Sequence, residues 1–182
     1  MRHSRLCIRA LDVIISFTLL ISLSPLLVFL TFISGWVTGS PLFFQTRVGK
    51  GGVPFQLIKF RSLPLGTPNV PTHHIDQRLI SPLGRMLRRT KLDELPQLVN
   101  VLRGDMSLVG PRPCLSTQVE LIKLRQATGL YQELPGITGF AQVARVDMSI
   151  PSTLVDIERQ HIDQSVFCYF ICLFRTVFGG SL

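Results

Sequence analysis

Hydrophobic residues run almost unbroken through one early segment of the chain. No charged residue lies between Val13 and Thr46, and residues 13–37 are almost entirely apolar. About 20 apolar residues are enough for an α-helix to cross a bilayer. Three interpretations are open: a signal peptide, a transmembrane helix, and a helix that enters one leaflet and returns to the same side. The run is long for a signal peptide, and no A-x-A cleavage site follows it.

The middle and the flanks of this segment favour the re-entrant helix. Pro25 removes a backbone hydrogen bond, and the hydroxyl of Ser24 can satisfy a backbone group freed in this way. Basic residues flank both ends: Arg2, Arg5 and Arg9 precede the segment, and Arg47, Lys50, Lys59 and Arg61 follow it. By the positive-inside rule, both ends then face the cytoplasm. We expect residues 1–40 to form a re-entrant membrane helix broken at Ser24 and Pro25, and residues 41–182 to form a cytoplasmic, membrane-associated domain.

The residues after this segment carry the pattern of a short β-hairpin. Two stretches with partial alternation, 41–48 and 53–61, flank a turn of sequence GKGG. The next residues, 62–77, contain three prolines and no hydrophobic period, which predicts a loop. His73 and His74 lie in this loop. We expect them to be solvated, because no partner at metal-ligand spacing accompanies them.

Helical periodicity dominates the rest of the chain, so the predicted fold class is α+β and mostly helical. The predicted helices cover residues 81–90, 93–103, 116–129 and 154–161. Ser81 and Pro82 supply an N-cap and a first-turn proline for the first of them. Thr117 and Glu120 have the spacing of a capping box for the third. We expect residues 133–145 to form a Gly-rich loop that enters a short strand.

The last apolar run, residues 165–178, is too short to span a bilayer comfortably, and it contains Arg175. It is expected to form an amphipathic helix at the membrane interface or a core helix. Cys168 and Cys172 would share one face of this helix, and we interpret them as buried thiols rather than metal ligands. The four cysteines of the chain are scattered, which indicates a reducing compartment and no disulfides.

Charge narrows the class of partner. Only 16% of the residues are charged, and Lys and Arg outnumber Asp and Glu by 19 to 11, which gives a net charge of +8. Such a balance suits an anionic partner: a nucleic acid, an acidic membrane surface or a phosphorylated substrate. The chain contains no zinc-finger or RNP motif, so we expect no nucleic-acid partner.

The adjacent carboxylates Asp93 and Glu94 are unusual in such a basic chain. Asp93 can be the N-cap of the helix that follows, with Glu94 at the positive end of the helix dipole. Alternatively, the pair holds a divalent cation beside a diphosphate, because Mg²⁺ binds one or two carboxylates and completes its shell with phosphate oxygens. An aspartate can also attack phosphorus as a nucleophile. Both interpretations remain open at this point.

Arginines near the pair favour the diphosphate site: Arg85, Arg88, Arg89, Arg103 and Arg112. Arg112 lies between two prolines in the sequence GPRP. Such a turn would hold its guanidinium rigidly, in a position suited to bidentate phosphate binding. The alternative for Arg112 is an ordinary surface arginine.

Several stretches of the chain resemble motifs of the bacterial sugar transferases known as monotopic phosphoglycosyl transferases. The longest, residues 92–113, has the sequence LDELPQLVNVLRGDMSLVGPRP. Residues 59–61 resemble the family's K-F-R motif, and residues 135–143 resemble its P-G-I-T-G-x-A-Q-V motif. Ser24 and Pro25 resemble the break in its re-entrant helix. The resemblance covers nearly the whole chain, in order, and is to the small, single-domain form.

The resemblance implies an enzyme that transfers a phosphosugar from a UDP-sugar to a polyprenol phosphate such as undecaprenyl phosphate, with release of UMP. This is the first membrane step of glycan assembly. The implied mechanism is ping-pong with Mg²⁺, in which Asp93 is the nucleophile, Glu94 is its partner, and both are expected at the metal. The substrate-binding residues implied in the same way are Lys59, Arg61, Arg88, Arg112, Thr138, Gln142 and Arg145.

Location and partners also follow from the resemblance. Residues 41–182 would be the catalytic domain of a monotopic protein on the cytoplasmic face of the bacterial inner membrane. Its partners would be the UDP-sugar, the polyprenol phosphate and inner-membrane lipid, and a homodimer is left open. The chain departs from the family in two places: its C-terminus is brief, and the residues after Ala-Gln-Val differ. Many relatives continue Ala-Gln-Val with Asn-Gly-Arg, whereas this chain continues with Ala144-Arg145-Val146, so its arginine falls one position early.

Two functions of other classes compete with the enzyme. One is a membrane-anchored adaptor in glycan export, whose basic face binds lipid headgroups. The other is a nucleic-acid-binding membrane protein, which would explain the charge. Neither gives a role to the pair Asp93 and Glu94.

Overall fold

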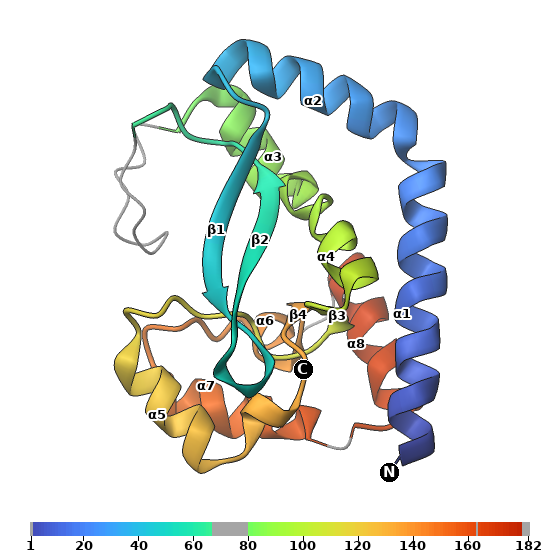
Figure 1. The fold of residues 1–182 in the computed structure, drawn as a ribbon, viewed down its shortest axis with the longest axis vertical. Helices are drawn as coiled ribbons and strands as arrows, with labels where there is room; N and C mark the ends of the chain where they lie inside the picture. Colours follow the sequence, from blue (N-terminus) through green and yellow to red (C-terminus); the bar gives the residue numbers. More distant parts are fainter. Residues whose placement is uncertain (1, 67–79, 163, 180–182) are drawn as a thin grey trace.

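A computed structural model describes residues 2–66, 80–162 and 164–179 of the chain (Figure 1). It shows an α+β fold that is mostly helical and contains two two-stranded sheets, which confirms the predicted fold class. The helices are α1 (Arg2–Ser22), α2 (Ser24–Thr38), α3 (Pro82–Thr90), α4 (Gln97–Arg103), α5 (Val119–Ala127), α6 (Phe140–Val143), α7 (Pro151–Glu158) and α8 (Val166–Phe178). His73 and His74 lie outside the described residues.

Helices α1 and α2 form a pair bent by 68°. Pro25 has no N–H to donate to the carbonyl of Ile21, and the hydroxyl of Ser24 donates to that carbonyl instead, at 2.8 Å. The helix breaks at Leu23, directly before the predicted Ser24 and Pro25, and α2 turns away over the hairpin (Figure 1). Within the described ranges, no single helix is long and apolar enough to span a membrane. The bent pair has the length and composition for it only when both helices are taken together.

The predicted hairpin is present. Strands β1 (Leu42–Val48) and β2 (Pro54–Phe60) pair in antiparallel fashion through the 3₁₀ turn η1 (Lys50–Gly52). Gln45 lies opposite Leu57, and both side chains are buried. This face of the hairpin is thus turned towards the rest of the domain, although one of its inward positions is polar.

The second sheet pairs two strands of three residues in parallel, β3 (Ser107–Val109) and β4 (Gly136–Thr138). A strand was expected within residues 133–145, but β3 was not predicted, because three residues are too few to show alternation. The sheet depends on Gly136, where an added Cβ would lie 2.1 Å from the backbone nitrogen of Gly110. After β4 the chain forms the short helix α6 rather than more strand.

The helix predicted at residues 93–103 begins later than expected. Asp93 and Glu94 belong to a separate 3₁₀ turn, η4 (Leu92–Glu94), and α4 begins only at Gln97. Neither η4 nor α4 has a side-chain hydrogen bond at its N-cap. The interpretation of Asp93 as a helix N-cap is therefore wrong.

The predicted capping box is also wrong. Helix α5 begins at Val119, and no side chain caps it. Oε1 of Gln118 accepts a hydrogen bond from the N–H of Leu115 at 2.9 Å. This bond closes a turn just before the helix, so Thr117 lies outside the helix and cannot pair with Glu120 as a capping box requires.

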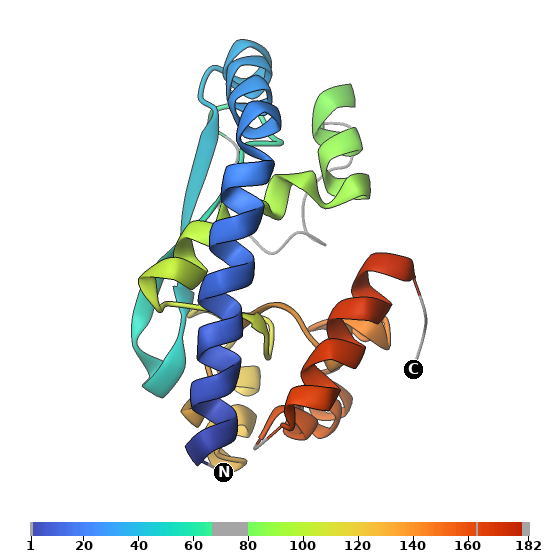
Figure 2. The same cartoon turned by 90° about the vertical axis from the view of Figure 1, so that its right-hand side faces the viewer.

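Helix α1 packs along α4, β3 and α8 (Figure 2). Asp12 links these elements: its Oδ1 accepts hydrogen bonds from the N–H of Leu108 and the hydroxyl of Tyr169, both at 2.9 Å. Tyr169 and Cys172 of α8 are fully buried in this core. One face of the predicted membrane segment thus packs against the domain core, and the division of the chain at residue 40 stays a prediction.

Candidate active site

A cavity of about 740 Å³ opens between α1, η4 and α4 on one side and β4, α6 and α8 on the other. Its lining combines basic and apolar side chains with the acidic residues Glu94 and Asp147 and several neutral polar ones. The basic ones are Arg47, Arg88, Lys91, Arg112 and Arg145. The apolar ones include Leu19 of α1, Leu95, Leu98, Ile137 and Leu173 of α8. A cavity of this kind suits a ligand that combines anionic and apolar parts.

The two carboxylates of η4 have different surroundings. Glu94 lines the cavity, and its Oε1 lies 3.0 Å from Nη2 of Arg112. Asp93 is buried, with 8% of its surface exposed, and lies beside the cavity rather than in its lining. Lys91 adopts a left-handed conformation, with φ of 57°, and so makes the sharp corner that joins α3 to η4.

Asp93 interacts electrostatically with two partly buried cations, Lys59 and Arg88. Burial raises the pKa of Asp93, and the charge of Glu94 raises it further, while Lys59 and Arg88 lower it. The pKa of Lys59 is lowered to about 8, first by burial and then by the charge of Arg47, with Asp93 opposing the shift. Burial also lowers the pKa of Arg88, again against Asp93. The three groups therefore form one electrostatically coupled cluster.

Arg47 belongs to this site, although sequence analysis placed it only among the basic flanking residues. Its Nη1 donates to the carbonyl of Pro113 at 3.1 Å, which ties β1 to the GPRP turn that carries Arg112. Its Nε and Nη2 donate to Oε1 of Gln45 at 3.0 and 2.6 Å. The available signal was the strand itself: Gln45 and Arg47 are polar at alternate positions of β1 that face the domain.

Thr138, Gln142 and Arg145 line the cavity from the opposite side. Arg145 follows the end of α6 with φ of 59°. Its own N–H donates to Gln142, and the N–H of Val146 donates to Ala141, at 3.2 and 2.9 Å, which is the pattern of a Schellman motif. Glycine is the favoured residue at this left-handed position, so an arginine there is strained. The arginine that falls one position early in the motif thus still lines the cavity.

The structure brings most of the predicted site residues together. Six of them line the cavity: Arg88, Glu94, Arg112, Thr138, Gln142 and Arg145. Asp93 and Lys59 adjoin it through their electrostatic contacts with Arg88. Arg61 does not line the cavity: its Nη2 donates to the carbonyl of Leu42 at 3.3 Å. Its guanidinium carbon lies 5.3 Å from the ring centroid of Phe43, as does Nζ of Lys59, so the two cations share this ring.

The carboxylates of η4 offer a limited metal site. No group of three or more His, Cys, Asp and Glu residues in the described part of the chain could hold a metal ion. Asp93 and Glu94 are two carboxylates, and a Mg²⁺ that shares its shell with a phosphorylated substrate needs only one or two from the protein. Glu94 contacts Arg112 in this structure, so a cation at Glu94 would compete with that ion pair.

Relatives of the chain support a family assignment. The UDP-glucose:undecaprenyl-phosphate glucose-1-phosphate transferase of Caulobacter vibrioides is 42% identical over 140 residues, which cover 74% of this chain and 52% of that protein. The undecaprenyl-phosphate galactose phosphotransferase of Salmonella typhimurium is 37% identical over 161 residues, which cover 79% of this chain and 33% of that protein. The exopolysaccharide production protein ExoY of Sinorhizobium fredii is 31% identical over 190 aligned positions, which cover 93% of this chain and 83% of that protein.

The family match covers nearly the whole of this chain, whereas this chain covers only part of some relatives. The chain spans about half the length of the Caulobacter protein and a third of the Salmonella protein. Residues 3–180 match the family described as bacterial sugar transferase. From its first helix to its last, this protein belongs to the bacterial sugar transferase family.

Proposed function

We propose that this chain transfers a sugar-1-phosphate from a UDP-sugar to undecaprenyl phosphate and releases UMP. The observation that carries the proposal is one cavity whose lining combines Glu94, basic side chains and leucines from α1 and α8, with Asp93 buried beside it. A nucleoside diphosphate sugar supplies two phosphates for the basic side chains, and a polyprenol phosphate supplies an apolar chain. The relatives named for such a transfer, with glucose or galactose as the sugar, support this reaction class.

Asp93 is the nucleophile in this proposal. Its carboxylate oxygen attacks the phosphorus that carries the sugar, and the bond from that phosphorus to the bridging oxygen breaks, so UMP leaves with that oxygen. A phosphate oxygen of the acceptor then attacks the same phosphorus and frees the carboxylate. No water is consumed in either half-reaction. Lys59 and Arg88 favour the charged carboxylate against the burial that raises the pKa of Asp93.

Arginines bind the donor in this proposal. Arg112 and Arg145 line the cavity, and a guanidinium can bind a phosphate through two parallel hydrogen bonds. In this structure Glu94 pairs with Arg112 at 3.0 Å, and a cation that binds Glu94 would free the guanidinium for the donor phosphate. Mg²⁺, held by Glu94 and Asp93 together with substrate oxygens, would neutralise phosphate charge when bound. Thr138 and Gln142 complete the donor site from the β4 and α6 side.

The lipid acceptor requires a cavity that adjoins a membrane. Exposed apolar side chains lie on three helices: Ile14, Phe17 and Ile21 of α1, Phe29, Phe32 and Trp36 of α2, and Phe167, Phe170, Phe174 and Phe178 of α8. We place these helices in the inner membrane of a bacterium, with α1 and α2 as a re-entrant pair and both ends of the chain in the cytoplasm. An isoprenoid chain that packs on Leu19 and Leu173 would continue onto the same surfaces.

A membrane-anchored adaptor is the competing function. Its basic face would bind lipid headgroups, but such binding needs no buried carboxylate between Lys59 and Arg88. A nucleic-acid-binding protein explains the net charge and leaves the same carboxylate without a role. A homodimer stays an open prediction for this chain.

Release of UMP from a panel of UDP-sugars tests the proposal. The full chain, undecaprenyl phosphate and Mg²⁺ should give many turnovers with at least one sugar. Without the acceptor, we expect a burst of about one UMP per protein, as a covalent mechanism requires. Asp156→Asn, which neutralises an exposed carboxylate of α7, should leave turnover unchanged. If UMP is released from none of the UDP-sugars, the proposed transfer is refuted and the adaptor function is favoured.

A further inference from the structure

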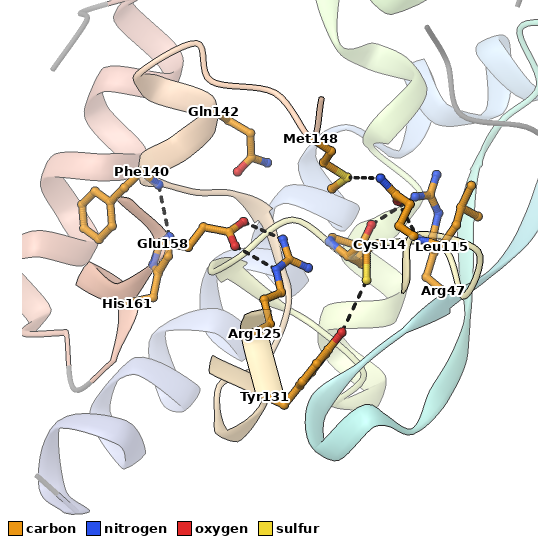
Figure 3. Close-up of polar contacts among 12 residues, drawn as sticks. Arg47, Cys114, Leu115, Arg125, Tyr131, Phe140, Gln142, Met148, Glu158 and His161 are labelled. Carbon is orange, nitrogen blue, oxygen red and sulfur yellow. Dashed lines mark hydrogen bonds and ion pairs between the residues drawn. The ribbon is translucent and has the colours of Figure 1, made fainter. Parts of the chain in front are cut away.

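A buried ion pair lies behind the GPRP turn, outside the lining of the main cavity. Glu158, at the end of α7, pairs with Arg125 of α5 through two bonds: Oε2 lies 2.8 Å from Nε, and Oε1 lies 2.7 Å from Nη2. The side chains of Glu158 and Arg125 are 0% and 2% exposed. Figure 3 shows the pair close to Tyr131, whose hydroxyl lies 3.5 Å from Sγ of Cys114.

This network contacts the turn on both sides of Arg112. Arg125 and Tyr131 line a small cavity together with Pro111 and Pro113. Tyr131 contacts Cys114, the residue directly after the turn. Burial raises the pKa of Glu158, Arg125 lowers it, and the backbone N–H of Arg112 lowers it to a smaller extent, so this N–H lies near the carboxylate. The ion pair therefore packs directly behind the residue whose guanidinium faces Glu94.

The sequence of the turn leaves Arg112 as the residue whose backbone N–H can anchor the turn. Pro111 and Pro113 have no N–H, so Arg112 carries the only backbone donor of these three residues. An acceptor for this donor restrains how the backbone of Arg112 is rotated, and thus where its side chain points. Burial raises the pKa of Glu158, and the paired Arg125 opposes this shift and favours the charged carboxylate, which accepts a stronger hydrogen bond than a neutral group would.

Stability alone gives no reason for a buried ion pair at this place. The cost of removing two charges from water can exceed their attraction, and apolar residues of similar volume are often as stable or more stable. Apolar side chains of similar volume could fill the space behind the two prolines. They could not accept a hydrogen bond from Arg112.

We infer that Arg125 and Glu158 are positioning residues: they hold the backbone of Arg112 so that its guanidinium meets Glu94 and the donor diphosphate. This inference rests on the proposed function, in which Arg112 binds the donor. It assigns the pair an effect on donor binding that acts only through Arg112.

A double-mutant cycle tests the inference. The variant Arg125→Met/Glu158→Leu removes both charges at similar volume, so we expect its thermal unfolding to lie near that of the wild type. Its KM for the UDP-sugar should rise about tenfold, as for the loss of a charge-assisted hydrogen bond, with a smaller effect on kcat. The same exchange in an Arg112→Ala background should change KM no further. Independent effects that multiply, or a wild-type KM in the apolar variant, would overturn the inference.

Hydrogen exchange at the Arg112 amide gives a second readout that needs no substrate. We expect this amide to exchange several times faster in Glu158→Gln than in the wild type, because the acceptor loses its charge. Asp156→Asn, on the same helix but exposed, is the matched control and should leave the exchange unchanged. This measurement decides the question even if the apolar variant does not fold, and unaltered exchange in Glu158→Gln would overturn the inference. Faster exchange in a protein that turns over no UDP-sugar would refute only the proposed transfer.

Discussion

Glu94 and Arg112 form an ion pair of 3.0 Å that joins turn η4 to the GPRP turn, 18 residues further along the chain. Their side chains are 19% and 46% exposed, so water screens the pair in part and it adds little to stability. The main effect of this ion pair is to fix the position of the Arg112 side chain. It holds a guanidinium at the edge of the cavity, next to the buried carboxylate of Asp93.

Arg112→Lys tests whether this geometry matters. An ammonium cannot reproduce the planar fork of a guanidinium. We expect kcat/KM for the UDP-sugar to fall about ten- to a hundredfold, as for the loss of a hydrogen bond between charged groups, while thermal unfolding is unchanged. Arg103→Lys makes the same exchange at an exposed arginine of α4 and should have little effect. Near-normal turnover in Arg112→Lys would show that Arg112 is an ordinary surface arginine with no bidentate phosphate contact.

Asp93→Asn tests the covalent step. An amide is too weak a nucleophile to form the acyl-phosphate, so turnover should fall by more than about a thousandfold. Wild-type protein incubated with UDP-sugar and Mg²⁺, without acceptor, should gain the mass of a phosphosugar on the peptide that contains Asp93. Peptide mass spectrometry measures this directly. An active Asp93→Asn protein, or a mass gain on another residue, would exclude Asp93 as the nucleophile.

Arg145→Gly should move stability and function in opposite directions. Glycine adopts the left-handed backbone at this position without steric cost, which should raise the free energy of unfolding by about 1 kcal/mol. The loss of a guanidinium from the cavity should at the same time raise KM for the donor. Thermal unfolding and steady-state kinetics measure the two effects. A variant that is stabilised and keeps its KM would show that Arg145 does not bind the donor.

Lys59 should give activity an alkaline limit. With its pKa lowered to about 8, Lys59 is charged at pH 7 and loses its charge as the pH rises through that value. Activity should fall over the same range, because the cation beside Asp93 and the donor phosphates disappears. Lys59→Arg retains the charge and should move this limit to higher pH. The same limit in Lys59→Arg and in the wild type would assign the titration to another group.

The same group should affect stability with the opposite sign. Between pH 8 and the ordinary lysine value of 10.5, the unfolded chain binds more protons at Lys59 than the folded chain does. The contribution of Lys59 to the free energy of unfolding therefore rises with pH across this window. Denaturant unfolding of the wild type and of Lys59→Met at pH 7.5 and 9.5 measures it. The difference in stability between the two proteins should shift in favour of the wild type at the higher pH.

Pro25→Leu tests the re-entrant arrangement. Leucine restores the N–H that can donate to the carbonyl of Ile21, so the bent pair should straighten and part of the population should cross the membrane. In intact cells, an impermeant thiol reagent should not reach the thiol of a Lys50→Cys variant in the otherwise unchanged chain. It should reach that thiol when Pro25→Leu is added. Labelling of Lys50→Cys with Pro25 in place would mean that α1 and α2 form a true span.

Local features were determined by the sequence itself. A proline lacks an N–H in any structure, so a helix break near Ser24 and Pro25 was predictable. The hydroxyl that donates to the carbonyl of Ile21 comes from Ser24, the residue just before this proline. The hairpin was equally predictable from alternation around GKGG. The motif around Asp93 and Glu94 identified candidate chemistry because its residue types stand close together in the chain.

Tertiary packing decided the features that join distant residues. Only the fold shows that Asp93 is buried between Lys59 and Arg88 instead of capping a helix, that Arg47 reaches the GPRP turn, and that Arg61 does not reach the cavity. The pairing of β3 with β4, and of Arg125 with Glu158 across 33 residues, had no sequence signal. Such contacts depend on how several elements pack against one another. The hydrophobic period and the residue spacing within one segment carry no information about that packing.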